Sequence, residues 1–317
     1  MHLSRTGLLG LAIKMFAAID IGSNSILLSI GKPDGNQLKM IVDECRVTGL
    51  AKGVLQGGSI SSQALERSKT ALREYRQTLD KHPEINGLKV VATESLRRPK
   101  NGEKVRKALS ECIGSEIEII SGDREAELSF WSVQKEHPDQ NQNKFVFDIG
   151  GASTELIFGN STGILQAESL KFGSVLLTEE FRLNETVRES NALQSVESAI
   201  KKSRVYKEFQ EAKCLGIGVA GTMTTLLAVQ KKLRHYEQSK VHLARISQQN
   251  VFDWMNKVLA LPLTEREKIV GLPKNRADIF GGGLVIIYAL CRCFHWNEIT
   301  CMDAGVRVGL LYEMLFS

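Results

Sequence analysis

The sequence predicts an α/β protein of two related halves that face each other across a cleft. Apolar segments of strand length alternate with segments that repeat apolar residues at helical spacing. One motif occurs twice: an apolar strand ends in Asp-Ile-Gly at residues 20–22 and again at 148–150, and a second apolar strand follows each time. A length of 317 residues favours two domains or one large domain.

The second copy of this motif, Phe145–Phe158, has residues that suit a phosphate ligand. Asp148 ends the first strand, and Glu155 returns a second carboxylate to the same place. Between them, Gly150 and Gly151 let the backbone turn sharply, with amide groups free to point outward. Amides bind phosphate oxygens, and paired carboxylates bind Mg²⁺ or its waters. Taken alone, the loop is equally consistent with a simple β-hairpin; the first copy favours the phosphate site, because two such turns can hold a ligand from both sides.

Composition excludes several classes of protein. Hydrophobic residues make up 43% and charged residues 24% of the chain, which is ordinary for a globular protein. The net charge of +5 includes no Lys/Arg run and aromatic residues are sparse, so we expect no nucleic-acid polymer as a partner. The six cysteines form no C-x-x-C pair and the six histidines lack metal-ligand spacing, so we expect reduced thiols, a cytoplasmic location and no zinc site.

Membrane association is not expected, since no segment reaches the ~20 continuous apolar residues of a membrane span. Residues 1–14 include a short apolar stretch, Leu8–Ile13, without a convincing cleavage site. We interpret them as an extension ahead of a start at Met15.

The predicted elements fall into two domains, 15–135 and 136–304, with the polar stretch 136–143 between them and the last helix, 305–317, packing back on the first domain. In the first domain we expect strands at 16–21, 25–30, 37–47, 88–92 and 117–120, and helices capped by Ser61, over 101–113 and from 121 to 133. In the second we expect strands at 145–149, 154–158, 164–170, 214–219 and 299–302, and helices after 174, across 185–211, from 220, over 247–260 and from about 275.

Three helix positions need separate comment. Glu125 and Glu127 lie in the first turns of the helix at 121–133, where the helix dipole favours negative charge, so a purely structural role is one interpretation. The start at Ala220–Thr225 is a third candidate anion site, because glycine precedes a helix N-terminus. Consecutive glycines at Gly281–Gly283 cost roughly 1 kcal/mol each in a helix, so we expect them to serve close packing or close approach by a ligand.

The succession of motifs resembles one family. The segments that carry the resemblance are Ala18–Ser25, Ala92–Arg97, Ile120–Ala126, Asp148–Glu155, Gly216–Thr222, Arg276–Asp278 and Asp303–Arg307. In this order they resemble the exopolyphosphatase / guanosine pentaphosphate phosphohydrolase (Ppx/GppA) family of the actin–hexokinase–Hsp70 superfamily, over nearly the whole chain from Phe16.

The resemblance implies a fold and an activity. It implies two ribonuclease-H-like domains, in a short two-domain member, with the site in the cleft between them. It also implies Mg²⁺-dependent (or Mn²⁺-dependent) hydrolysis of a terminal phosphoanhydride. The family allows a homodimer, which the sequence itself does not show.

The family pattern and the chemistry of the side chains together assign roles. The glutamate before alanine in the family's Ser-Gly-x-x-Glu-Ala motif is the catalytic base, which implies Glu125 rather than Glu127. The other expected roles are metal binding by Asp20, Asp148 and Glu155, with Asp148 and Glu155 also serving catalysis, and phosphate binding by Gly22, Ser23, Asn24, Arg97, Gly150, Gly151, Ala152 and Ser153.

Two departures from the family pattern bear on function. Ala152 stands where the family usually has a third glycine, and a left-handed backbone there would cost roughly 1–2 kcal/mol. The segment Arg46–Leu50 lacks the usual Thr-Arg-Leu order, so a basic contact is displaced to Arg46 or lost.

Several functions therefore remain open at this point. The leading hypothesis is an exopolyphosphatase that removes orthophosphate from the end of polyphosphate. The second is a pppGpp 5′-phosphohydrolase with the same machinery; basic charge along the cleft would favour the polymer. The third is a non-catalytic polyphosphate or nucleotide sensor. The fourth, a kinase of the same superfamily, is disfavoured because Glu125 in its motif points to water as the attacking group.

Overall fold

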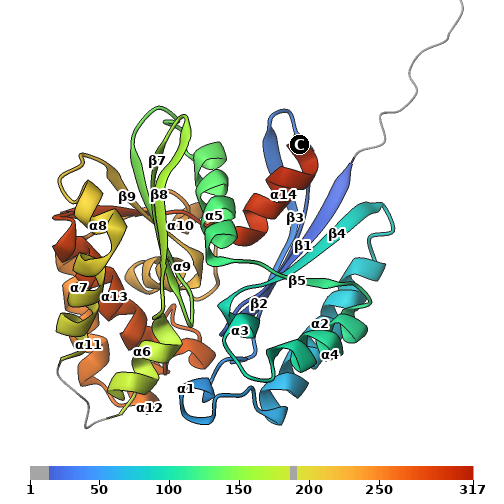
Figure 1. The fold of residues 1–317 in the computed structure, drawn as a ribbon, viewed down its shortest axis with the longest axis horizontal. Coiled ribbons are helices and arrows are strands. Elements are labelled where there is room, and N and C mark those ends of the chain that lie inside the picture. The colour runs from blue at the N-terminus through green and yellow to red at the C-terminus, as the bar shows by residue number, and fades with distance from the viewer. Residues whose placement is uncertain (1–13, 186–190, 317) are drawn as a thin grey trace, which may run out of the picture.

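The computed structural model describes residues 14–185 and 191–316, and these form two lobes, each built on a β-sheet (Figure 1). The predicted α/β class is confirmed. The interpretation of residues 1–14 lies, apart from Lys14, outside the described residues, as does part of the helix predicted across 185–211. No helix in the described ranges is long and apolar enough to cross a membrane.

The first lobe contains a five-stranded sheet of order β3-β2-β1-β4-β5. Its strands are β1 (Met15–Ile21), β2 (Ser25–Asp34), β3 (Gln37–Val47), β4 (Ile85–Ala92) and β5 (Ile117–Ile119). Strands β1 to β3 pair antiparallel, while β4 runs parallel to β1 and β5 parallel to β4. The carboxyl ends of β1 and β4 therefore lie together at one edge of the sheet.

The second lobe repeats this topology. Its strands are β6 (Lys144–Ile149), β7 (Thr154–Asn160), β8 (Gly163–Leu170), β9 (Leu215–Val219), β10 (Arg245–Ser247) and β11 (Glu298–Cys301). Three antiparallel strands, β6 to β8, are followed by β9 and β11 in parallel, and β10 adds an antiparallel edge strand. Both lobes thus have the ribonuclease-H-like strand order, which confirms the predicted fold class.

In the first part of the chain the helices are α1 (Val54–Gly57), α2 (Ser62–Asp80), α3 (Glu94–Arg97), α4 (Gly102–Ile113) and α5 (Gly122–Glu136). The three helices predicted for the first domain are found as α2, α4 and α5, and two short helices, α1 and α3, were not predicted. Ser61 and Ser121 cap α2 and α5, because their side chains accept hydrogen bonds from backbone N–H groups at the first turn.

The second lobe has more and shorter helices than the sequence predicts. They are α6 (Ser174–Phe181), α7 (Ala192–Lys202), α8 (Arg204–Phe209), α9 (Ala220–Gln230), α10 (Gln238–Val241), α11 (Gln248–Ala260), α12 (Leu263–Arg266), the 3₁₀ turn η1 (Lys274–Arg276) and α13 (Phe280–Cys293). The glycines of α13 do serve close packing: a Cβ at Gly282 would lie 2.5 Å from Thr178 Oγ1 of α6, and one at Gly283 would lie 2.4 Å from Thr222 Cγ2 of α9.

The chain crosses between the lobes twice, at 137–143 and at 302–305. Helix α5, before the first crossing, buries Ala126, Phe130 and Val133 against strands of the second sheet. Helix α14 (Val306–Phe316), after the second crossing, packs Val306, Leu310 and Leu311 against Ala18 and Val91 of the first sheet. The two helices lie side by side between the lobes (Figure 1). Helix α5 precedes the domain boundary expected at 135/136 and yet packs on the second lobe, so this boundary stays a prediction.

Candidate active site

A crevice between the lobes brings together both Asp-Ile-Gly turns. It is lined by Asp20 and residues 22–25 of the first turn, 148–153 of the second, Thr93, Glu125, the start of α9 and residues 304–306. Every side chain or turn that we expected at the site lines this crevice, except Arg97 and Glu155. Asp20, Glu125 and Asp148 therefore share one cavity, although they come from both lobes.

The two turns are closed by equivalent backbone hydrogen bonds. The Gly22 N–H donates to the Ser25 carbonyl oxygen at 2.9 Å, and the Gly150 N–H donates to the Ser153 carbonyl oxygen at 3.0 Å. These two amides are consequently used within the turns rather than free for a ligand.

The glycines of the second turn are needed because other atoms lie close to them, and not because the backbone has a positive φ. Neither Gly150, Gly151 nor Ala152 has a positive φ. A Cβ at Gly151 would lie 2.8 Å from Ser23 Cβ of the opposite lobe and 3.0 Å from Val175 Cγ2. The strain that we considered for Ala152 is therefore absent, and Gly151 is the position where the two turns meet.

Three buried carboxylates, Glu125, Asp148 and Glu155, and the partly buried Asp20 form the electrostatic centre of the site. Burial raises the pKa of Asp20 to about 7, with Asp148 adding to the rise and Arg307 opposing it. Burial also raises the pKa of Asp148 to about 6, against a hydrogen bond from Ser129. The pKa of Glu125 lies well above its ordinary value because of burial and of the neighbouring Glu155, Asp148 and Asp20. Such a cluster carries unfavourable repulsion at neutral pH unless a cation is present.

Glu155 lies behind the crevice. It is the residue opposite Asp148 in the antiparallel register of β6 and β7. Its side chain is fully buried and accepts a hydrogen bond from Ser169 Oγ at 2.7 Å. Burial and Asp148 raise the pKa of Glu155 to about 8. Its second oxygen, Oε2, and Asp20 Oδ1 are buried with no hydrogen-bond partner among the described residues.

The donor chemistry of these carboxylates suits a cation, and metal binding by Asp20, Asp148 and Glu155 stays a prediction. Within the described part of the chain, no three His, Cys, Asp or Glu side chains lie together as a set able to hold a metal ion. Glu155 does not line the crevice with Asp20 and Asp148. Mg²⁺ often uses only one or two carboxylates and takes its other ligands from water and substrate phosphates, which suits the crevice.

Arg97 lies beside Glu125 rather than on the crevice wall. Its Nη2 is 3.4 Å from Glu125 Oε2, its Nε donates to Glu94 Oε2 at 3.0 Å, and its Nη1 donates to the Ile120 carbonyl oxygen. Arg97 is thus turned toward Glu125 and does not line the crevice, and its role in phosphate binding stays a prediction.

Sequence reasoning did not single out Arg276, which lines the crevice directly. Its Nη2 is 3.3 Å from Ser25 Oγ of the opposite lobe, and its Nη1 is 3.3 Å from Thr225 Oγ1. Gly221 makes room for it, because a Cβ there would lie 2.1 Å from Arg276 Nη1. The segment Arg276–Asp278 belongs to the family pattern and could have indicated this residue, but the pattern assigned no role to Arg276.

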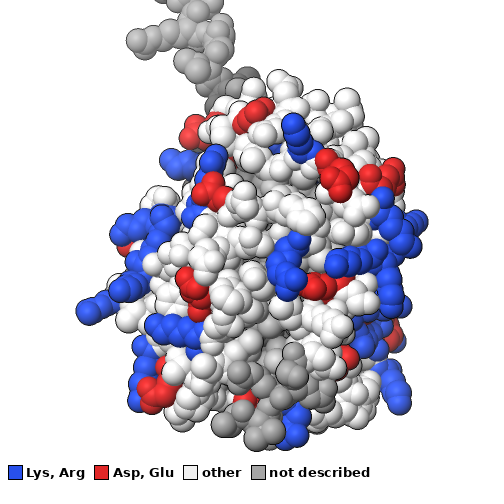
Figure 2. Space-filling model, turned by 90° about the vertical axis from the view of Figure 1, so that its left-hand side faces the viewer, with Lys and Arg blue, Asp and Glu red and all other residues white. Residues whose placement is uncertain are grey.

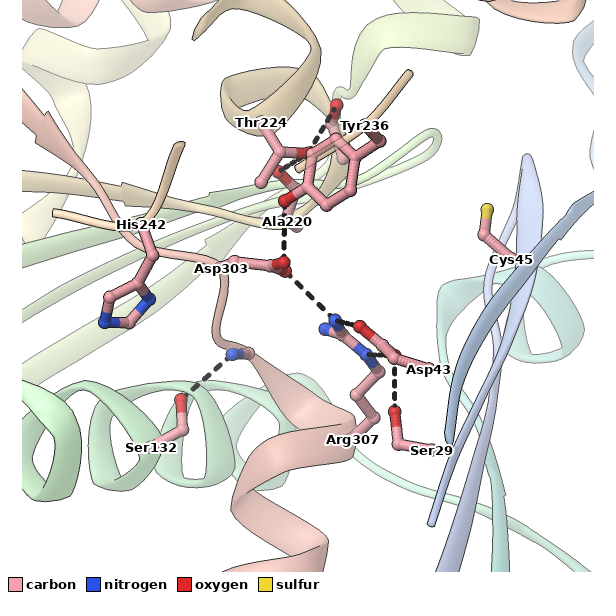
Figure 3. A network of polar contacts seen from close by, with 12 residues as sticks. Ser29, Asp43, Cys45, Ser132, Ala220, Thr224, Tyr236, His242, Asp303 and Arg307 are labelled. Atoms are coloured by element: carbon pink, nitrogen blue, oxygen red, sulfur yellow. Dashed lines mark hydrogen bonds and ion pairs between the residues drawn. The ribbon is translucent and has the colours of Figure 1, made fainter. Parts of the chain in front are cut away.

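An ion-pair network joins the lobes behind the crevice (Figure 3). Arg307 of α14 pairs with Asp43 of β3 at 2.8 Å and with Asp303, at the second crossing, at 3.0 Å. Tyr236 donates its hydroxyl hydrogen to Asp303 at 2.6 Å. Burial disfavours the charge on Arg307, but Asp303 and Asp43 more than compensate and raise its pKa. The guanidinium thus remains charged near Asp20 and Asp148.

A larger chamber of about 580 Å³ adjoins the crevice and shares Ala220, Gly221 and Arg276 with it. Its described charged lining consists of Arg234, Arg276 and Arg307 and of Asp43, Glu44 and Asp303. Apolar side chains, among them Leu27, Val47, Leu233 and Leu272, and the ring of Tyr236 complete the wall.

The segment 46–50 explains why this chamber is not more basic. Residues 43–45 and Val47 of β3 line the chamber, whereas Arg46 does not. Arg46 instead pairs with Glu74 at 2.7 Å and with Glu44 at 3.0 Å. The basic contact questioned from the sequence is therefore absent from this wall.

Fold and crevice together define a two-lobed, ribonuclease-H-like protein with a carboxylate-lined crevice between the lobes. The sequence matches the Ppx/GppA phosphatase family over residues 29–317. The chain belongs to this family.

Similar proteins agree with that assignment. A bifunctional 3-dehydroquinate synthase/phosphatase of Fusobacterium nucleatum is 32% identical over 94% of this chain and 46% of its own length. Exopolyphosphatase 2 of Mycobacterium tuberculosis is 29% identical over 89% of this chain and 91% of its own length. A guanosine-5′-triphosphate,3′-diphosphate pyrophosphatase of Aeromonas salmonicida is 28% identical over 95% of this chain and 59% of its own length. The chain thus spans about half of the first of these relatives.

Solved structures show the same fold. An exopolyphosphatase-like protein superposes with a TM-score of 0.87 at 28% identity, covering 95% of this chain and 97% of that one. An exopolyphosphatase from Cytophaga hutchinsonii superposes with a TM-score of 0.85 at 25% identity, with the same coverage.

Proposed function

We propose that this chain hydrolyses the terminal phosphoanhydride of a linear phosphate chain and releases orthophosphate, with inorganic polyphosphate as the leading substrate. The observation that carries the proposal is the convergence of both Asp-Ile-Gly turns and Glu125 on one crevice. The exopolyphosphatase names of the relatives support it.

Binding of the terminal phosphate falls to the two turns and Arg276. Ser23 and Asn24 lie on one side of the crevice and residues 150–153 on the other, so a phosphate between them receives hydrogen bonds from both lobes. Arg276 adds a charge at the chamber side, where the next phosphate of the chain would lie. Positioning and charge stabilisation of this kind are the main requirements of phosphoryl transfer.

Asp20 and Asp148 are the residues that would hold Mg²⁺ or Mn²⁺, with Glu155 acting through them from behind the wall. The unpartnered oxygens of Asp20 and Glu155 and the raised pKa values of this cluster support this assignment. A bound Mg²⁺ supplies charge neutralisation for the phosphates and for the carboxylates.

Glu125 is the general base. Its first-turn position on α5 places it on the crevice wall, and burial together with the neighbouring carboxylates raises its pKa, which makes the carboxylate a stronger base toward water. In the reaction, Glu125 takes a proton from the attacking water, the water oxygen bonds to the terminal phosphorus, and the bond to the bridging oxygen breaks.

A second candidate substrate, pppGpp, is favoured by the chamber. A polyphosphate chain would gain most from a basic wall, whereas the chamber combines equal numbers of arginines and carboxylates with apolar side chains. On the outer face of the second lobe, Lys and Arg are interspersed with Asp and Glu among the described residues (Figure 2). The name of the Aeromonas relative points to the same substrate.

The test is a phosphate-release assay on the purified chain, with polyphosphate and pppGpp offered side by side in Mg²⁺ and in EDTA. The proposal predicts release of orthophosphate from at least one substrate, lost in EDTA. Release from neither substrate would refute it, and the ratio of the two kcat/KM values decides between the candidates.

A further inference from the structure

Each of the three guanidinium nitrogens of Arg97 makes one contact with the protein. Nε contacts Glu94 Oε2, Nη1 contacts the Ile120 carbonyl oxygen, and Nη2 contacts Glu125 Oε2. These contacts use three of the five N–H groups of the guanidinium and hold it toward Glu125, and each charge-assisted contact contributes roughly 1.5–3 kcal/mol.

The contacts fix Arg97 between three elements that surround Glu125. Arg97 ends α3, which follows β4; Ile120 follows β5; and Glu125 lies in the first turn of α5. Helix α3 is itself attached to the first turn of the site, because the buried Ser95 donates its hydroxyl hydrogen to the Ile21 carbonyl oxygen at 2.5 Å. Arg97 therefore holds a constant position relative to the site.

The contact with Glu125 is made through one oxygen only. Arg97 engages Oε2, which leaves Oε1 outside this contact. The side chain of Glu125 is 8% exposed and that of Arg97 is 23% exposed, so the pair is shielded from most of the solvent. Glu94 accepts from Nε of the same guanidinium at 3.0 Å, and this second contact limits its rotation.

We propose that Arg97, held by Glu94, is a positioning residue that orients Glu125 toward the attacking water and does not bind substrate phosphate. This inference rests on the proposed function, since it assumes that Glu125 acts as the base. It assigns Glu94 a role, and it gives Arg97 a role different from the one that we expected from the sequence.

The experiment compares Arg97→Gln and Glu94→Gln with Arg98→Gln, a matched control whose side chain is exposed next to Arg97. Two quantities are measured: kcat and KM for phosphate release, and the Kd of methylenediphosphonate with Mg²⁺, a phosphoanhydride analogue that cannot be hydrolysed.

A loss of kcat of about 30-fold or more is expected for Arg97→Gln, because general-base catalysis contributes 10²–10⁴-fold. KM and Kd should stay within about threefold of wild type, since no ground-state contact is removed. Glu94→Gln should lower kcat in the same direction but less, and Arg98→Gln should change neither quantity. The acidic limb of the pH profile of kcat should move to higher pH in Arg97→Gln, because Arg97 lowers the pKa of Glu125.

A rise of tenfold or more in KM and Kd with kcat retained would show Arg97 to be a phosphate ligand and would overturn the inference. So would unchanged kinetics in both variants. If Arg97→Gln does not fold, Glu94→Gln decides by the same criteria. A wild-type chain that neither releases phosphate nor binds the analogue would refute the proposed function, and this inference with it.

Discussion

Replacing Gly151 with alanine is expected to disturb the contact between the two phosphate turns. The added methyl group would lie 2.8 Å from Ser23 Cβ and 3.0 Å from Val175 Cγ2, whereas carbon atoms normally pack about 3.5–4.0 Å apart. Ser23 and Val175 are both buried and cannot swing into solvent. The turns must therefore separate by several tenths of an ångström.

The expected size of the effect follows from overpacking. Extra methyl groups in a packed interior cost about 1–3 kcal/mol. If the closed arrangement of the turns is the one that binds the transition state, this cost lowers kcat/KM by roughly 5- to 150-fold, since about 1.4 kcal/mol corresponds to a factor of ten.

The assay is orthophosphate release at several substrate concentrations, together with thermal unfolding of each variant. Gly57→Ala is the matched control: a Cβ at Gly57 meets nothing within 4 Å, and its φ is not in the left-handed region. We expect Gly57→Ala to retain wild-type kcat/KM. A Gly151→Ala variant whose kcat/KM stays within twofold of wild type would refute the reasoning that the turns must touch.

Three further changes test separate parts of the site. Glu155→Gln should stabilise the metal-free protein by roughly 2–4 kcal/mol at pH 8.5 and not at pH 4, as measured by urea denaturation. The sign follows because the pKa of Glu155 is about 8 in the fold against an ordinary 4.5, so stability falls as pH rises between these values; equal stabilisation at both pH values would contradict it. Ala152→Gly should lower stability by about 0.4–1 kcal/mol without raising kcat/KM, because Ala152 has no positive φ; increased activity would show that its methyl group crowds the phosphate. Arg276→Gln should raise KM by about tenfold or more, the loss of one charge-assisted contact, and an unchanged KM would exclude Arg276 from substrate binding.

Local sequence patterns predicted the parts of the site that depend on local structure. The repeated Asp-Ile-Gly motif predicted two equivalent turns, because a strand, a tight turn and a returning strand are set by neighbouring residues. The motif around Glu125 placed that residue in a helix start, and α5 begins there. The convergence of these parts on one crevice was expected from the repeat and is found in the structure.

Tertiary packing decided what the sequence did not predict. The glycines of the second turn were expected to serve a sharp backbone turn, but Gly151 is required by Ser23 of the other lobe, which is distant in the sequence. The contacts of Arg97 and Arg276 also depend on elements that are far apart along the chain, and no local pattern indicates which partner a guanidinium group will take. The mixed lining of the chamber likewise depends on the relation between β3 and the region around Tyr236.

The central claim is that Glu125 activates water for attack on a phosphoanhydride held between the turns. The most direct measurement is orthophosphate release by Glu125→Gln and by Glu127→Gln, with binding of Mg²⁺ and methylenediphosphonate measured on the same samples. Glu127 lies two residues further along α5, is exposed and pairs with Arg124, so its variant controls for the loss of a carboxylate from this helix. The account predicts that Glu125→Gln binds the analogue but loses release by about 100-fold or more, while Glu127→Gln retains it; release that persists in Glu125→Gln would contradict the account.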